Sequence, residues 1–91
     1  MVTSIILINA ERSKINALAE QLADVEGISE VYSVSGSYDL IAIARIATND
    51  DLAELVTNKM YELEGIEKTE TMLAFKAFSR HDLERMFSLG M

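Results

Sequence analysis

The chain has 91 residues, of which 49% are hydrophobic and 25% are charged, a balance typical of one globular domain with a small core. Its formal net charge is −7, and a surface of that sign repels phosphate backbones, so direct nucleic-acid binding is not expected. The sequence contains no cysteine, which excludes disulfides and cysteine-ligated metals and fits a cytoplasmic protein. No apolar run approaches the roughly 20 residues of a membrane span, so no membrane insertion is expected.

The first half of the chain predicts a strand and a helix. Residues 4–9 include four consecutive branched apolar side chains, which indicate a strand with both faces buried. Residues 13–24 predict a helix that ends just before Gly27, where a left-handed residue commonly closes a helix. The apolar positions of this helix form one stripe: Ile15, Leu18, Ala19, Leu22 and Ala23.

The second half predicts a hairpin, a helix, a strand and a short terminal helix. Residues 31–34 and 40–46 are two strands joined by a turn at Gly36. Residues 51–64 form a helix whose start is capped by residues 48–51. Residues 68–78 form the last strand, followed by a short helix that Ser79 or Asp82 can cap. The apolar stripes of the two helices are Leu52, Leu55, Val56, Met60 and Leu63 in one, and Leu83, Met86 and Phe87 in the other.

A weak internal repeat organises these elements. The sequences of residues 25–28 and 63–66, Val-Glu-Gly-Ile and Leu-Glu-Gly-Ile, each end a helix and precede a strand. Two β-α-β halves in this order predict an α+β, ferredoxin-like sandwich over residues 1–91, with a four-stranded antiparallel sheet and the first and third strands central. Two helices can cover only one face of that sheet. The other face is also apolar, so we expect a two-fold dimer in which a second copy covers it.

The residues offer little for catalysis or metal binding. His81 is the only histidine, and a position at the start of an exposed helix explains it better than acid–base chemistry. The acidic residues Asp50 and Asp51 are better explained as helix-start residues than as a cation site. No phosphate-binding glycine loop is present. We therefore expect no catalytic residues, no metal and no cofactor.

Polar residues at the hairpin turn and on the last strand are the candidate ligand contacts. Thr69 and Thr71 are two apart, so their hydroxyls project from one face of the strand, while Glu70 points the other way. Asp39 and turn carbonyls could accept from the ammonium of a free amino acid, and the amides near Gly36 and the threonine hydroxyls could donate to its carboxylate. The alternative is that Asp39 caps its own hairpin, Tyr38 packs at a rim and the threonines only favour a strand.

The sequence Val-Ser-Gly-Ser-Tyr-Asp-Leu of residues 34–40, with Gly65, Thr69 and Thr71, resembles the effector-binding (RAM) domain of the Lrp/AsnC regulator family. The resemblance covers nearly the whole chain and implies a dimeric α/β barrel-like assembly in which dimers join into a larger ring, an octamer or decamer. It implies that a small effector, commonly an amino acid, binds between dimers. The site residues it implies are Gly36, Ser37, Tyr38, Asp39, Thr69 and Thr71.

Family members usually carry an N-terminal DNA-binding helix-turn-helix, and this sequence starts directly before its first strand. The resemblance therefore implies the stand-alone form of the domain, acting on transcription or amino-acid metabolism through protein partners such as a full-length Lrp/AsnC regulator. The rival from another class is a small enzyme with the same fold, such as a monooxygenase, which needs an enclosed polar cavity between sheet and helices. The apolar helix stripes count against that rival.

Overall fold

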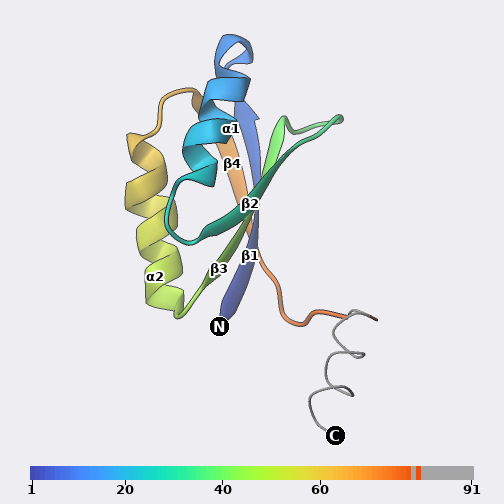
Figure 1. Cartoon of the computed structure of the whole chain (residues 1–91), viewed down its shortest axis with the longest axis vertical. Coiled ribbons are helices and arrows are strands. Elements are labelled where there is room, and N and C mark those ends of the chain that lie inside the picture. The colour runs from blue at the N-terminus through green and yellow to red at the C-terminus, as the bar shows by residue number, and fades with distance from the viewer. Residues whose placement is uncertain (79, 81–91) are drawn as a thin grey trace, which may run out of the picture.

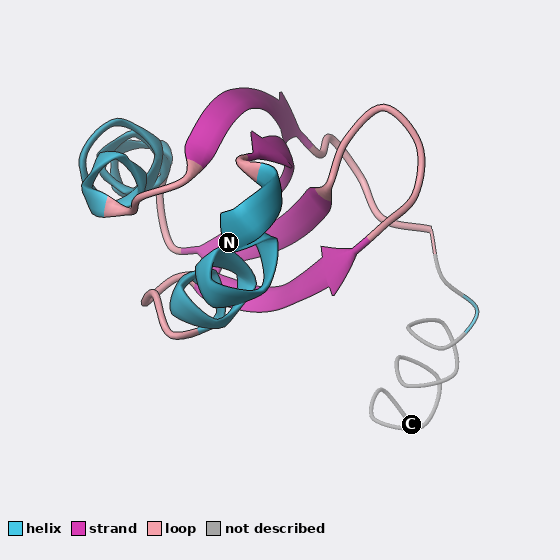
Figure 2. Ribbon diagram, turned by 90° about the horizontal axis from the view of Figure 1, so that it is seen from above, coloured by secondary structure: helices cyan, strands magenta, loops and turns pink. Residues whose placement is uncertain are grey.

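The structure is a computed structural model that describes residues 1–78 and 80. Its elements follow the order β-α-β-β-α-β and form one four-stranded antiparallel sheet with the strand order β2-β3-β1-β4. Both helices pack on the same face of this sheet (Figures 1 and 2). The predicted α+β ferredoxin-like fold is confirmed, with the first and third strands in the centre. The strands are β1 (Val2–Ala10), β2 (Ile28–Ser33), β3 (Leu40–Ile46) and β4 (Ile66–Leu73).

The two central strands bury alternate residues under the helices. On β1, every second residue from Ser4 to Ala10 is buried, and on β3 the same holds from Leu40 to Ala44. Ser4 is the one polar member of this buried set, and its hydroxyl donates to the carbonyl oxygen of Met72 at 2.7 Å. The residues between them point to the other face of the sheet, which no helix of the described chain covers. Within one copy, the prediction that both faces of these strands are buried therefore holds for the helix face alone.

The first helix is shorter than predicted. A 3-10 turn (Arg12–Lys14) precedes α1 (Ile15–Ala23). Leu18 and Leu22 are buried and Ala19 packs against the core, as predicted, whereas Ala23 is exposed. Ala23 lies one residue, or about 100° of helical rotation, past Leu22, which puts it at the edge of the buried stripe.

The second helix is not one regular α-helix, as residues 51–64 predicted, but three segments in sequence. They are α2 (Asn49–Glu54), a π-helical turn (Leu55–Lys59) and a 3-10 turn (Met60–Glu62). The Thr48 hydroxyl caps the start by accepting from the backbone N–H of Asp51 at 3.1 Å. The predicted apolar stripe is confirmed: Leu55 and Met60 are buried, and Leu52, Val56 and Leu63 pack against the core.

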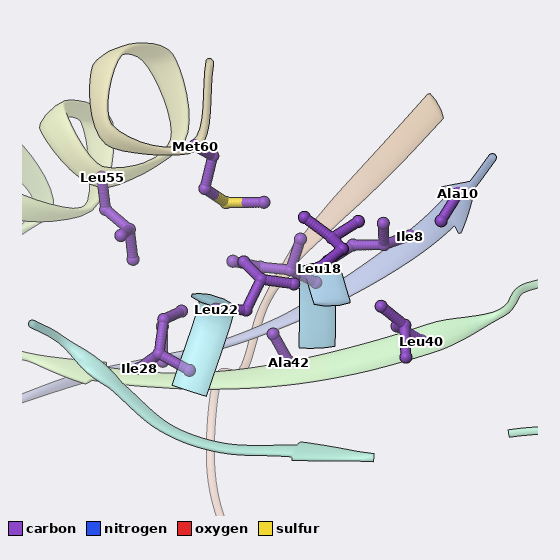
Figure 3. Packing of buried hydrophobic residues seen from close by; sticks show 11 residues of the cluster. Ile8, Ala10, Leu18, Leu22, Ile28, Leu40, Ala42, Leu55 and Met60 are labelled. Atoms are coloured by element: carbon purple, nitrogen blue, oxygen red, sulfur yellow. The ribbon is translucent and has the colours of Figure 1, made fainter. Parts of the chain in front are cut away.

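Side chains from both helices and the inner face of the sheet fill a continuous core. Figure 3 shows Leu55 and Met60 projecting from the second helix toward the interior that Leu18, Leu22 and Ile8 also occupy. The chain turns into β2 at Gly27, whose φ of +101° is the left-handed conformation predicted there. A Cβ at Gly27 would lie 2.8 Å from the Cγ2 atom of Ile46, so the turn also requires the absence of a side chain.

Two strand boundaries differ from the prediction by three residues or more. Strand β2 begins at Ile28, three residues before the predicted start, and β4 ends at Leu73 instead of continuing to residue 78. The ladder between β1 and β4 ends with Ser4 opposite Leu73 and a last bond from Ala74 N to Thr3 O at 2.9 Å. Beyond this point β1 has almost no residues left to pair. The predicted terminal helix, with His81, Asp82, Leu83, Met86 and Phe87, lies outside the described residues, as does Ser79.

Candidate functional site

The connection between β2 and β3 is the loop of residues 34–39, which projects beyond the sheet (Figure 1). Its base is closed by a hydrogen bond from Val34 N to Asp39 O at 3.0 Å. Gly36 has a φ of +112°, as the predicted turn requires, and no atom lies within 4 Å of the position of a Cβ there. Gly36 and Ser37 are exposed at the tip.

Asp39 fastens the loop to the end of β1. Its backbone N–H donates to Ile8 O at 2.9 Å, and its side-chain Oδ2 accepts from Ala10 N at 2.8 Å. The pairing of β1 with β3 ends at Ile8 opposite Leu40, so the last residues of β1 have no partner strand on that side. The Asp39 carboxylate accepts the hydrogen bond that a partner strand would otherwise accept from Ala10 N. It does so through Oδ2, so its Oδ1 atom is not used in the bond to Ala10. Asp39 thus caps a backbone, but that of β1 and not that of its own hairpin.

Tyr38 reaches further, past β1 to β4 at the edge of the sheet. Its hydroxyl donates to Glu70 Oε2 at 2.7 Å. Glu70 lies opposite Leu7 on the face without helices, and β1 separates β3 from β4, so this bond spans the end of β1. The hydrogen bond to the Glu70 carboxylate raises the pKa of the Tyr38 phenol, with smaller effects from burial and from the charge of Glu70.

Thr69 and Thr71 lie on the other face of β4. They pair with Ile8 and Ile6, whose side chains are buried under the helices, so both hydroxyls project from one face, as predicted, and this face is the helix side. Leu40, Ile8 and Thr69 form one cross-strand row. This row places Thr69 at the same end of the sheet as the loop, two strand spacings or about 10 Å from β3.

The structure thus brings the loop residues and Thr69 to one end of the sheet, with Thr71 nearer the middle, and does not enclose them in one cavity. Asp39 and Tyr38 anchor the loop, the tip residues face outward, and the threonines lie at the edge on the opposite face from the Tyr38–Glu70 bond. Sequence reasoning missed Glu70 as a partner of Tyr38. The available signal was the alternation along β4, which puts Glu70 on the face opposite to the threonines.

Two open grooves flank the second helix. One, of about 320 Å³, lies between β4 and the π-helical and 3-10 turns that continue α2, and is called here the α2–β4 groove. It is lined by Val56, Met60, Tyr61, Leu63, Ile66, Glu67, Lys68 and Thr69. It contains one predicted residue, Thr69. The other groove, of about 360 Å³, is lined by Gly27, Ile46, Asp51 and Lys59 among others. It is the larger of the two, but it lies at the far end of β3 from the loop and contains none of the predicted residues.

The face without helices has an apolar centre with polar groups toward its ends. Its central side chains come from both inner strands and from β4: Ile5, Leu7, Ile41, Ile43 and Met72. Toward one end, Arg45 Nη1 forms an ion pair with Glu30 Oε1 at 3.1 Å and donates to Ser29 Oγ at 2.6 Å. The hydroxyl of Tyr32 donates to Glu30 at 2.7 Å, and this bond, followed by the Arg45 contact, lowers the pKa of Glu30.

Residues 1–78 and 80 contain neither a cluster of metal ligands nor a membrane-spanning helix. No group of three or more His, Asp or Glu side chains in this part of the chain could hold a metal ion. Among the same residues, no helix is long and apolar enough to cross a membrane.

Comparison with known proteins assigns the family. The solved structure of TTHA0845 from Thermus thermophilus is 42% identical with a TM-score of 0.82, and the match covers 88% of this chain and 100% of that one. AsnC of E. coli shares the fold, with 21% identity, a TM-score of 0.80 and coverage of 87% and 54%.

A protein described as an uncharacterized HTH-type transcriptional regulator of Pyrococcus furiosus is 34% identical over 58 residues, which are 64% of this chain and 39% of that protein. The match thus spans about two fifths of this relative's length. The family model of the Lrp/AsnC ligand binding domain matches residues 3–83. The chain belongs to the Lrp/AsnC ligand-binding domain family, whose curated relatives are transcriptional regulators.

Proposed function

We propose that this domain is a sensor that binds a small effector, an amino acid, between two dimers at the loop end of its sheet. The observation that carries the proposal is the double anchoring of the loop of residues 34–39. Asp39 ties it to β1 and Tyr38 ties it to β4, so the exposed residues Gly36 and Ser37 are presented by a fixed loop in a member of a ligand-binding family.

The dimer of this proposal forms through the face without helices. Its apolar centre and polar ends have the anatomy of a protein interface, and a second copy related by a two-fold axis would cover it with the same surface. Exposed residues at this face include Tyr32 and Met72, with relative exposures of 51% and 42%. Large contiguous apolar patches of this kind are rare on monomers.

A single copy offers complementary halves of a zwitterion site but does not close it. The Oδ1 atom of Asp39 can accept from the ammonium of an amino acid, and the amides of Gly36 and Ser37 can donate to its carboxylate. Thr69 can add a hydroxyl at the same end of the sheet, and Thr71 a second one nearer its middle. Because these groups lie on an open surface, a second dimer has to supply the opposite wall.

Such a site couples ligand binding to assembly. A ligand held by two dimers binds the joined state more tightly than the separate state, so it shifts the population toward joined dimers. A change in assembly would then alter transcription or amino-acid metabolism through a partner, and a full-length Lrp/AsnC regulator joined in mixed oligomers is the partner we propose.

The rival, a small monooxygenase-like enzyme, needs a polar cavity between sheet and helices. That space is occupied by apolar side chains that are almost completely buried, including Ile6, Ile8, Leu18 and Leu40. The curated relatives also point to regulation, so we retain the sensor as the proposed function.

The test is a thermal-shift screen with the common amino acids, combined with light scattering to measure particle mass. We expect one amino acid to raise the melting temperature and the mass of the assembly together. Asp39→Asn should abolish this response, since the amide keeps an oxygen acceptor for Ala10 N but loses the charge for the ammonium. Glu20→Gln, an exposed charge change on α1, is the matched control and should respond like the parent chain. If no amino acid shifts either quantity, or if Asp39→Asn responds fully, the sensor proposal is wrong.

A further inference from the structure

Two phenylalanines stand almost completely in solvent just after the last strand. Residues 74–78, called here the arm, have the sequence Ala-Phe-Lys-Ala-Phe and run away from the sheet beyond the end of β4 (Figure 1). Phe75 is 97% exposed and Phe78 is 85% exposed. Lys76 lies over the Phe78 ring with its Nζ 5.1 Å from the ring centroid. Aromatic side chains exposed to this degree on a short segment indicate a surface that contacts another apolar surface.

The α2–β4 groove at the opposite end of the same strand has a mixed lining that includes apolar side chains. Its walls are formed by Val56, Met60 and Tyr61 on the second helix and by Ile66 at the start of β4. Its volume of about 320 Å³ is in the range of small-ligand pockets. Glu67 and Lys68 also line the groove, so their charges offset each other and the apolar side chains are the groups that the arm contacts.

The geometry of β4 separates the arm from the groove of its own chain. The strand runs from Ile66 to Leu73, a distance of about 23 Å at 3.3 Å per residue. The groove lies beside its first residue and the arm leaves from its last. To reach its own groove the arm would have to reverse directly after Leu73, whereas the Ala74 N–H continues the ladder by donating to Thr3 O at 2.9 Å.

A second copy of the chain can place a groove within reach of the arm. Strand β4 is an edge strand, and its outer side pairs with no strand in the described part of the chain. Two copies placed with their β4 edges antiparallel bring the last residues of each β4 beside the first residues of the other. In this two-fold arrangement each arm lies beside the groove of the other copy. Two phenylalanines bury about 300–500 Å² per arm, so both arms with the surfaces that they cover reach the roughly 1,200 Å² at which specific interfaces begin.

We infer that the arm of one copy packs into the α2–β4 groove of a second copy. This contact uses the β4 edge and is separate from the contact proposed for the face without helices, so one chain can take part in both. It explains how dimers could be linked into larger assemblies. It does not depend on an effector.

The absence of native cysteine allows a direct test by disulfide crosslinking in the full-length chain without added amino acids. One protein carries Phe75→Cys and a differently tagged second protein carries Tyr61→Cys; the two are mixed and mildly oxidised. We expect at least five times more of the mixed crosslink than from Phe75→Cys mixed with Glu20→Cys, a control on α1. Equal yields for both mixtures would overturn the inference.

A second measurement tests the same contact without crosslinking. The double variant Phe75→Ala/Phe78→Ala should lower the particle mass in light scattering by a factor of about two, with unchanged circular dichroism because both rings are exposed. An unchanged mass would count against the inference. A crosslink within one chain of the variant Phe75→Cys/Tyr61→Cys at high dilution would show that the arm covers its own groove, which also contradicts it. Loss of an amino-acid response with an intact crosslink would refute the sensor alone.

Discussion

The anchor between Asp39 and β1 predicts a specific loss of stability. Asp39→Ala removes the acceptor for Ala10 N, which lies 2.8 Å from Oδ2 in a residue that is only 6% exposed. A hydrogen bond to a charged group contributes about 1.5–3 kcal/mol, and its loss leaves a buried donor unpaired. We therefore expect the free energy of unfolding to fall by about 2–3 kcal/mol. For a domain of this size the melting temperature should fall by about 10–20 °C.

Asp39→Asn separates the hydrogen bond from the charge. The amide oxygen can still accept from Ala10 N, so the loss should be about 1 kcal/mol, the difference between a charged and a neutral acceptor. The assay is urea unfolding followed by circular dichroism, at one fixed protein concentration because association makes the midpoint depend on concentration. A loss below about 0.5 kcal/mol for Asp39→Ala, or equal losses for both variants, would refute the reasoning.

Three further predictions follow from other contacts. The pKa of the Tyr38 phenol is raised, so the folded state holds this proton more tightly; the resulting stabilisation is present below pH 10 and is lost as the pH rises through the raised pKa. Glu70→Gln should therefore move the titration of the phenol, followed by absorbance, back toward pH 10. An unmoved titration would contradict the hydrogen bond between Tyr38 and Glu70. Gly27→Ala should lower the urea midpoint more than Gly36→Ala, since both glycines have positive φ but only Gly27 lacks room for a Cβ; equal shifts would contradict this. Ile43→Lys on the face without helices should halve the particle mass in light scattering at unchanged helix content, and an unchanged mass would rule out the sheet-to-sheet dimer.

Much of the fold could be predicted because local signals and packing agree. The apolar runs of β1 and β3, the helix stripes and the glycines at positions 27 and 65 all specify the same β-α-β-β-α-β arrangement. Both glycines have φ values close to +100°, as the internal repeat indicated. The end of β4 could not be predicted, because Phe75 and Phe78 are of a residue type enriched in strands and only the length of β1 limits the pairing.

The candidate site was harder to predict because its contacts are long-range. The alternation along β4 correctly put Thr69 and Thr71 on one face. The partners of Asp39 and Tyr38 lie 29 and 32 residues away in the sequence; the alternation along β4 gives the face of Glu70, but no local pattern pairs it with Tyr38. For Asp39, the hairpin sequence indicated a capping residue, but only the sheet register shows that the strand it caps is β1.

The π-helical turn at Leu55–Lys59 has a consequence for the length of the second helix. Leu55 and Met60 are five positions apart, which in an α-helix would turn them about 140° away from each other, yet their exposures are 1% and 3%. The wider turn accommodates one additional residue, so both side chains reach the interior. A chain from which Thr57 or Asn58 is deleted, both of them exposed, should therefore form a regular α-helix here. The side chains of Leu55 and Met60 would both still point into the core. A one-residue deletion in α1 would instead rotate the helical residues that follow it by about 100° about the helix axis.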